Sequence, residues 1–278
     1  PTETDQEGHA WTVRKGRRVW MGGRGGEFGW PLALRGRWWL NEESRGTLAD
    51  LACVIQDEES LMPLLLVSGG PWLFDQCDLL SAVCTTIKVL SEASVEARNS
   101  SIGGLDEEHR AADAVQVLGE ARFSGARCHL RFAGEYSRLL RAYDSAFVHL
   151  RESTLRHGAM AASLDDLSHV RLEECDLSHF SVAAFNTQFN GKAARLDLVR
   201  TNVTGRYLWF NQDRPVVLDK GSNLHVQHLE GAWQHFSVRI RDNLNVHRQA
   251  SILVEPPPEE QENEENADPE EEEGQGFA

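Results

Sequence analysis

Pairs of carboxylates are the first residues of this chain to consider for chemistry, because glycosidic-bond hydrolysis uses two carboxyl groups about 5 to 10 Å apart. Asp78 and Asp176 hold the same position in two copies of a recurring pattern, four copies apart. If the copies stack like neighbouring strands, these two residues lie about 19 Å from each other. Glu173 and Glu174 are adjacent, and adjacent residues of a strand point to opposite faces. Neither pair is predicted to be catalytic.

A cluster of side chains assembled from loops is the remaining candidate for a catalytic centre. Glu107, Glu108 and Asp113 lie close in sequence to Arg110, so a fold could bring carboxylates and a base together there. The glycine-rich stretch 22–26 is not predicted to bind phosphate, because it lacks the Gly-Lys-Ser/Thr that ends a phosphate-binding loop. No nucleophile-elbow pattern surrounds any serine.

The histidines do not form a metal-binding pattern. His225 and His228 are the most closely spaced candidates, but in a strand they face opposite ways. Neither a third ligand nor a Cys-x-x-Cys lies near them, as a zinc site would need. The sequence therefore predicts no metal and no cofactor.

An eight-residue pattern organises the middle of the chain: apolar, any, apolar, any, any, small, polar, apolar. Its six copies are separated by steps of 23, 28, 25, 22 and 26 residues. The apolar and small positions of the copies are Trp72/Phe74/Cys77/Leu79, Val95/Ala97/Ser100/Ile102, Phe123/Gly125/Cys128/Leu130, Val148/Leu150/Ser153/Leu155, Val170/Leu172/Cys175/Leu177 and Leu196/Leu198/Thr201/Val203.

Units of this length predict an all-β solenoid. A unit of 22 to 28 residues with two or three short strands and no room for a helix cannot close a core alone, whereas stacked units can. A pentapeptide repeat is the competing interpretation, since Leu167, Leu172, Leu177 and Val182 lie five apart. That spacing ends at Thr187 and leaves the earlier units unexplained.

The pattern in segments 170–177 and 196–203 resembles the right-handed parallel β-helix of pectate-lyase-like proteins. In style it is closest to non-catalytic eukaryotic members such as F-box-only and SHC-binding proteins. The resemblance implies a fold that hosts both enzymes and scaffolds. We expect an N-terminal basic, glycine-rich arm and cap at 1–30, a β-helix of about eight rungs at 31–229, a C-terminal cap at 230–255 and a disordered acidic tail at 256–278.

Stacking turns columns of sequence into ladders of side chains about 4.8 Å apart. One outward column places a histidine, an arginine and an aspartate in successive rungs, where they could pair. The N-terminal basic segment is a second place for contacts. The candidate interaction surface consists of His149, Arg171, Asp197, Arg14, Arg17 and Arg18.

A second outward column holds charges of opposite sign in neighbouring rungs. It predicts the ion pairs Arg127–Glu152 and Glu174–Arg200. Solvated cross-strand pairs of this kind contribute up to about 1 kcal/mol each.

Composition indicates a soluble chain in a reducing compartment, the cytoplasm or an organelle interior. Cys77, Cys128 and Cys175 share the small position of the repeat, which favours reduced, inward-packed thiols over disulfides. The net charge is −15, and eleven of the acids follow Val254. No apolar run approaches the roughly 20 residues of a membrane span.

These features favour a non-enzymatic interaction scaffold, a subunit of a larger assembly that binds protein partners and no nucleic acid. The alternative is a carbohydrate-active enzyme or sugar-binding module, for which Trp38, Trp39 and Trp209 are the residues to inspect. A third reading takes the acidic tail as a ligand for basic proteins such as histones.

Overall fold

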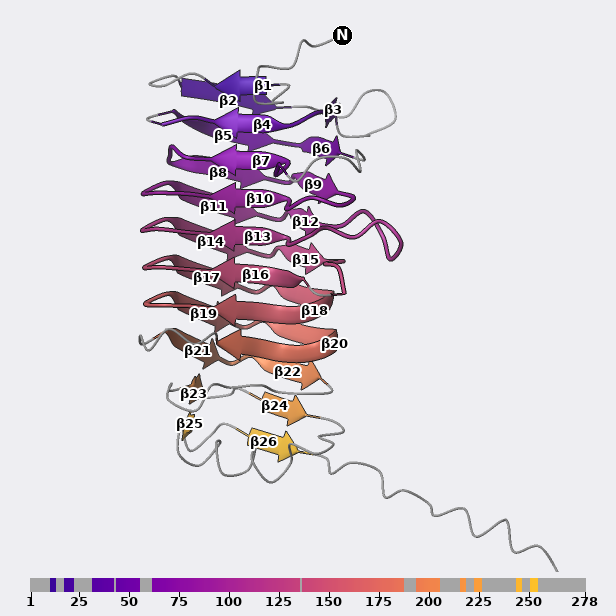
Figure 1. Ribbon diagram of the computed structural model, residues 1–278, viewed down its shortest axis with the longest axis vertical. Helices are drawn as coiled ribbons and strands as arrows, with labels where there is room; N and C mark the ends of the chain where they lie inside the picture. The colour runs from indigo at the N-terminus through magenta and orange to yellow at the C-terminus, as the bar shows by residue number, and fades with distance from the viewer. Residues whose placement is uncertain are drawn as a thin grey trace, which may run out of the picture.

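The computed structural model describes residues 32–55, 62–187 and 194–205, apart from 43 and 136, and the backbones of short strands at 11–13, 18–22, 216–218, 223–226, 244–246 and 251–254. Side chains are described between Gly36 and Thr204. Every element in these parts of the chain is a β-strand, and the strands stack as a parallel solenoid (Figure 1). The all-β, parallel β-helix architecture is confirmed.

The first face of the solenoid, face I, is a ten-stranded sheet in which each strand pairs in parallel with the next. It consists of β2 (Arg18–Gly22), β5 (Arg45–Ala49), β8 (Trp72–Asp75), β11 (Ser94–Arg98), β14 (Arg122–Ala126), β17 (Phe147–Arg151), β19 (His169–Glu173), β21 (Arg195–Val199), β23 (Val216–Leu218) and β25 (Leu244–Val246).

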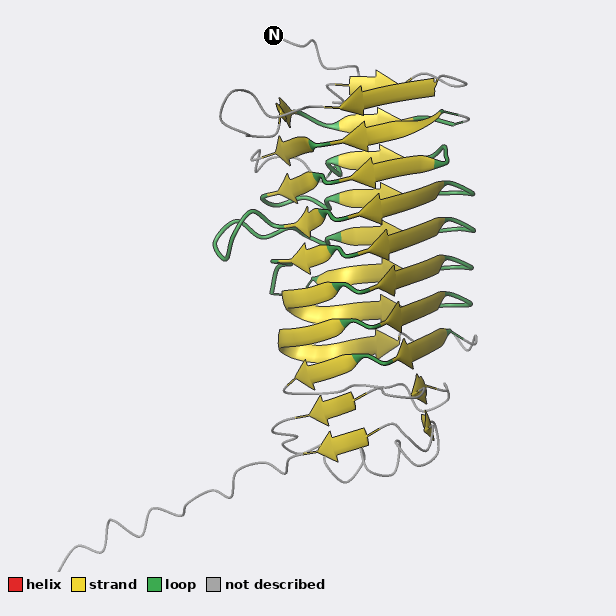
Figure 2. Ribbon diagram, turned by 180° about the vertical axis from the view of Figure 1, so that it is seen from behind, coloured by secondary structure: helices red, strands yellow, loops and turns green. Residues whose placement is uncertain are grey.

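A 16-stranded sheet supplies the other two faces (Figure 2). Face II consists of β3 (Leu32–Arg35), β6 (Leu51–Ile55), β9 (Asp78–Ser81), β12 (Ser101–Gly103), β15 (His129–Arg131), the first parts of β18 (Thr154–Leu164) and β20 (Asp176–Thr187), β22 (Asn202–Gly205), β24 (Asn223–Val226) and β26 (Ser251–Val254). Face III consists of β1 (Trp11–Val13), β4 (Trp38–Leu40), β7 (Leu65–Val67), β10 (Ile87–Val89), β13 (Val115–Val117), β16 (Arg138–Ala142) and the second parts of β18 and β20.

The six copies of the pattern stack in the register that their alignment predicts. The first apolar positions of all six pair along face I, and the last apolar positions pair along face II. The two columns are Trp72, Val95, Phe123, Val148, Val170, Leu196 and Leu79, Ile102, Leu130, Leu155, Leu177, Val203. All of these side chains are buried in one core.

The second apolar positions of the pattern form a further column on face I, in which large and small side chains complement one another. Phe74, Ala97, Gly125 and Leu150 are consecutive in the face I register. A Cβ added to Gly125 would lie 2.5 Å from Leu150 Cδ2. The glycine is therefore required because its neighbour occupies the space of a side chain, as close packing dictates.

The corner between faces I and II turns on a residue with positive φ in every copy. These residues precede the small position, with φ between 46° and 55°, and none is glycine: Gln76, Asn99, Arg127, Glu152, Glu174 and Arg200. A left-handed residue turns the chain sharply and ends the alternation of the strand. The small residue that follows must then fit inside the turn.

Thiols and hydroxyls alternate along that small column. The backbone N–H of Cys77 donates to Ser100 Oγ at 3.1 Å, and that of Cys128 donates to Ser153 Oγ at 3.1 Å. The third pair, Cys175 with Thr201, follows the same pattern at 3.4 Å. Each hydroxyl thus gives the buried N–H of the preceding turn an acceptor.

The corner between faces II and III differs from turn to turn. The segment 104–114 joins β12 to β13 and projects from the stack as a loop (Figure 1). The segment 132–137 joins β15 to β16. In the next two turns β18 and β20 run through this corner as single long strands.

The segments assigned to caps and tail fall largely outside the described residues. Within 1–30 and 230–255, only the backbones of the short strands named above are described, and the acidic segment 256–278 is outside them entirely. None of the described segments is a helix that could cross a membrane.

Candidate interaction surface

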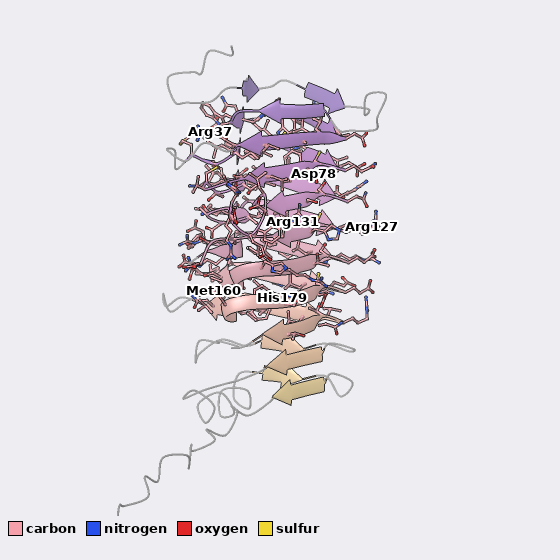
Figure 3. All side chains as sticks on the ribbon, turned by 90° about the vertical axis from the view of Figure 1, so that its right-hand side faces the viewer. Arg37, Asp78, Arg127, Arg131, Met160 and His179 are labelled. Atoms are coloured by element: carbon pink, nitrogen blue, oxygen red, sulfur yellow. The ribbon has the colours of Figure 1, made fainter. Side chains whose placement is uncertain are left out.

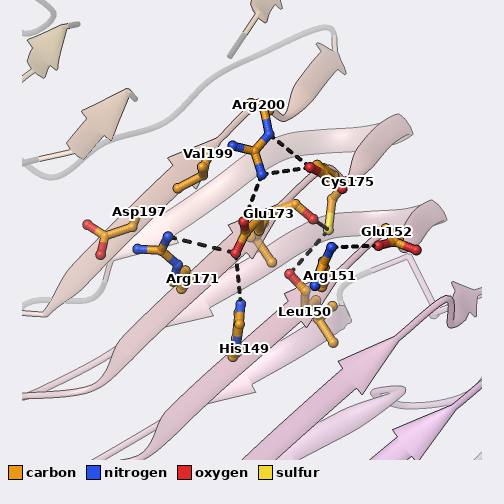
Figure 4. Close-up of polar contacts among 12 residues, drawn as sticks. His149, Leu150, Arg151, Glu152, Arg171, Glu173, Cys175, Asp197, Val199 and Arg200 are labelled. Carbon is orange, nitrogen blue, oxygen red and sulfur yellow. Dashed lines mark hydrogen bonds and ion pairs between the residues drawn. The ribbon is translucent and has the colours of Figure 1, made fainter. Parts of the chain in front are cut away.

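The predicted column of His149, Arg171 and Asp197 exists on face I. The three residues are consecutive in the register of β17, β19 and β21. Their side chains nevertheless do not pair with one another. His149 and Arg171 both approach Glu173 (Figure 4), whereas Asp197 pairs with Arg195.

Glu173 is the centre of the charged network on this face. Its carboxylate lies 3.5 Å from His149 Nε2 and 3.7 Å from an Arg171 nitrogen. Arg200 approaches it from the corner of the next turn, at 2.8 Å. With its side chain 20% exposed, this carboxylate is partly shielded from water, which strengthens its interactions with the guanidinium groups of Arg171 and Arg200.

Glu173 and Glu174 do not point to opposite faces, which corrects the prediction from strand alternation. Arg200 Nη2 lies 2.8 Å from Glu173 and 2.6 Å from Glu174. The reason is the positive φ of Glu174, 55°, which places it in the corner and not in the strand. Both carboxylates are engaged by one guanidinium, so neither is arranged as the proton donor that glycoside hydrolysis requires.

Asp197 is buried, which corrects its assignment as an outward, solvated residue that could pair with Arg171. The residue is 2% exposed. Its carboxylate accepts from Arg195 Nε at 2.8 Å and lies 2.9 Å from His169 Nε2. The hydrogen bond and charge of Asp197 raise the pKa of Arg195.

His169 and Arg195 were not predicted as site residues, because they lie in neither of the two outward columns from which contacts were predicted. Phe147, His169 and Arg195 form the neighbouring outward column of the same strands. The Phe147 and His169 rings meet edge to face, with centroids 5.1 Å apart. The alternation of Arg195 and Asp197 within one strand was the available signal.

The remaining predicted contacts have mixed outcomes. Arg127 and Glu152 form an ion pair at 3.7 Å, as the second column predicts. Arg14 and Arg17 lie outside the described residues, and only the backbone of Arg18 is described, at the start of β2. The N-terminal part of the candidate surface therefore stays a prediction.

The loop cluster considered for catalysis does not bring its acids together. Asp113 is 3% exposed and accepts hydrogen bonds from the Arg138 backbone N–H at 2.8 Å and from Gln116 Nε2 at 2.5 Å. Glu107 and Glu108 lie on the exposed part of the loop 104–114. Asp78 and Asp176 share a face II column four strands apart.

No group of three or more metal-ligating side chains converges among the described residues. The five cysteines are all free and buried. Burial raises the pKa of Cys53 and Cys175 to about 12 and that of Cys77 to about 11. Raised pKa values keep these three thiols protonated at neutral pH. Metal ligation and nucleophilic attack both use the thiolate, so we interpret these side chains as packing groups.

Of the tryptophans proposed for sugar binding, the two that the structure describes do not form an exposed platform. Trp38 is 2% exposed and belongs to the core. Trp39 is half-buried on face III, and its Nε1 donates to Ser68 Oγ at 3.1 Å. Trp209 lies outside the described residues.

Comparison with known proteins gives no family. The chain matches no family model, no curated protein and no solved structure. The resemblance to pectate-lyase-like and F-box-only proteins therefore rests on the sequence pattern, while the parallel solenoid itself is shown by the strand register.

Proposed function

We propose that this chain is a non-enzymatic interaction scaffold, a subunit of a larger protein assembly in a reducing compartment, which binds a protein partner through face I around Arg171. The observation that carries this proposal is the network around Glu173, in which side chains of three successive turns, among them two arginines, are held in place. Stacked strands fix the spacing of these charges. A fixed pattern of charge favours specific recognition by a complementary protein surface.

The carbohydrate-active alternative requires a carboxyl pair that is free to exchange protons. On face I, Glu173, Glu174 and Asp197 are each bound to a guanidinium of the chain itself. This supports a surface for binding over a site for turnover.

Co-purification of the tagged full-length chain from its native source tests the proposal. We expect a stoichiometric protein partner that is lost with Arg171→Glu, since a second carboxylate beside Glu173 reverses the local charge. Lys88→Glu is the matched control, because Lys88 is an outward, half-buried cation of face III. The partner should remain with this variant.

Two results would overturn the proposal. One is retention of the same partner by both variants, which would place the interface elsewhere. The other is turnover of acidic or neutral polysaccharides, with or without calcium, measured as new reducing ends or as absorbance of unsaturated products.

A further inference from the structure

Arg131 on face II differs from the other arginines of its neighbourhood. Its guanidinium has no carboxylate partner among the described residues, and its Nε is buried without a hydrogen-bond acceptor. The guanidinium carbon lies 5.3 Å from the centroid of the Phe132 ring. A buried donor without an acceptor is rare in a folded protein, so this site is incomplete as it stands.

A second guanidinium lies beside the first. Arg131 and Arg156 are direct neighbours in the register of β15 and β18, which places their backbones about 4.8 Å apart. Like charges in this arrangement repel. Arg156 is relieved by an ion pair with Asp176 in the following turn, whereas Arg131 has no such partner. Figure 3 shows Arg131 on this face of the stack.

A column of stacked rings holds Arg131 in position. The Phe132 ring stacks on His157 with centroids 5.2 Å apart, and His157 stacks on His179 at 4.8 Å. All three residues have positive φ, so their rings occupy the same corner of successive turns. Burial, together with the neighbouring His179, lowers the pKa of His157, so this ring is protonated less readily than an ordinary histidine.

The acids around this corner, including those of the loop 104–114 and Glu135 of the segment 132–137, form no ion pair with Arg131 among the described residues. Asp106 accepts hydrogen bonds from the backbone N–H groups of Glu108 and His109, at 2.9 and 2.8 Å. Glu107 interacts electrostatically with His157. Neither acid contacts Arg131. The missing partner of Arg131 must therefore come from another part of the chain or from outside it.

We propose that Arg131, with Arg156 beside it, binds carboxylates of this chain's own glutamate-rich segment, residues 255–273. A guanidinium and a carboxylate form charge-assisted hydrogen bonds, which the chain also uses at Arg195 on face I and at Arg200 in the corner between faces I and II. The segment carries eleven acids and no lysine or arginine. It lies outside the described residues, so its occupancy of the site is the inference.

The length of the chain permits this contact. Strand β26 ends at Val254 on face II, five strand steps from β15. Five steps are about 24 Å at about 4.8 Å per step. Eight extended residues span about 26 Å, so Glu262 and the acids after it can reach Arg131.

Zero-length crosslinking of the full-length chain tests the proposal. Arg131→Lys keeps the charge and supplies an amine that a carbodiimide couples to a touching carboxylate. Arg122→Lys is the matched control, because Arg122 is an exposed arginine of face I that also lacks a carboxylate partner among the described residues. We expect peptides from 255–273 joined to position 131 in monomers, not to position 122, and loss of this product at high salt, which screens exposed charges.

A second measurement separates the contact from a folding defect. Cleavage of the segment by a glutamyl endopeptidase should be several-fold faster in the Arg131→Gln/Arg156→Gln variant than in the parent chain, with the unfolding midpoint little changed. Arg122→Gln should leave the cleavage rate unchanged.

Three results would overturn the inference. Crosslinks at position 131 that do not exceed those at position 122 would remove the site. Crosslinks found only in dimers would assign the contact to a second copy. Coupling of the acidic segment to Lys15 in every variant, with cleavage independent of Arg131, would place the segment on the N-terminal basic stretch instead.

Discussion

The backbone N–H of Cys128 donates a hydrogen bond to the hydroxyl of Ser153, one turn further along the solenoid, at 3.1 Å. The same hydroxyl donates to the carbonyl of Arg151 at 2.7 Å. Ser153 is 1% exposed, so water cannot replace it. One small side chain therefore satisfies two backbone groups of two different turns.

Ser153→Ala should destabilise the chain by about 1 to 3 kcal/mol, because it leaves the Cys128 N–H buried without an acceptor. Urea unfolding followed by circular dichroism measures the change. Ser124→Ala is the control, since Ser124 is an outward residue of face I, and it should cost less than about 0.5 kcal/mol. Equal effects of the two substitutions would contradict the role of the hydroxyl.

Gly125→Ala should destabilise the chain by about 1 to 3 kcal/mol through overpacking. The added Cβ would meet Leu150 Cδ2 at 2.5 Å. Shortening that neighbour should give relief, so the double variant with Leu150→Val should lose less stability than the sum of the single variants. Strict additivity of the two free-energy changes in urea unfolding would show that the contact is not the cause.

Asp197→Asn should cost about 1.5 to 3 kcal/mol, the usual range for hydrogen bonds to a charged group. The substitution keeps the shape but removes the charge that Arg195 and His169 approach. Glu152→Gln tests an exposed ion pair of the same surface, with Arg127, and should cost less than about 1 kcal/mol. A loss of unfolding free energy in Asp197→Asn that does not exceed the loss in Glu152→Gln would contradict the buried role of Asp197.

The thiols should resist modification in the folded chain. Burial raises the pKa of Cys53 and Cys175 to about 12 and that of Cys77 to about 11, from 9.0. At mildly alkaline pH a thiol reagent should therefore react at the rate of unfolding, and added urea should accelerate it. Rapid labelling of any one cysteine in the absence of denaturant would contradict this.

The same thiols predict the alkaline limit of stability. Their folded pKa values lie above the unfolded value, so their contribution is complete below pH 9 and is lost as the pH rises from 9 towards 12. Cys175→Ser should reduce this alkaline loss, because it removes one ionising group. A thermal unfolding midpoint that falls by the same amount in the parent and in Cys175→Ser between about pH 9 and 12 would contradict this role of the thiol.

The sequence by itself determined the solenoid and its register. Alternation in a strand is local, so Val170 and Leu172 had to share a side with their counterparts in each copy. Equal spacing of Cys77, Cys128 and Cys175 within their copies placed all three thiols in the interior, where they lie. These conclusions needed no knowledge of contacts between turns.

Only the tertiary structure decided the partners of Glu173 and Asp197. Glu174 turns toward the partner of Glu173 because its φ is positive, and strand alternation no longer holds at such a corner. Asp197 pairs with His169 of the preceding turn and with Arg195 of its own strand, not with Arg171. The ring column that presents Arg131 arises at a corner where the connection changes from a loop to the continuous strands β18 and β20. Periodicity determines which residues share a column, whereas corner geometry and side-chain reach determine which of them touch.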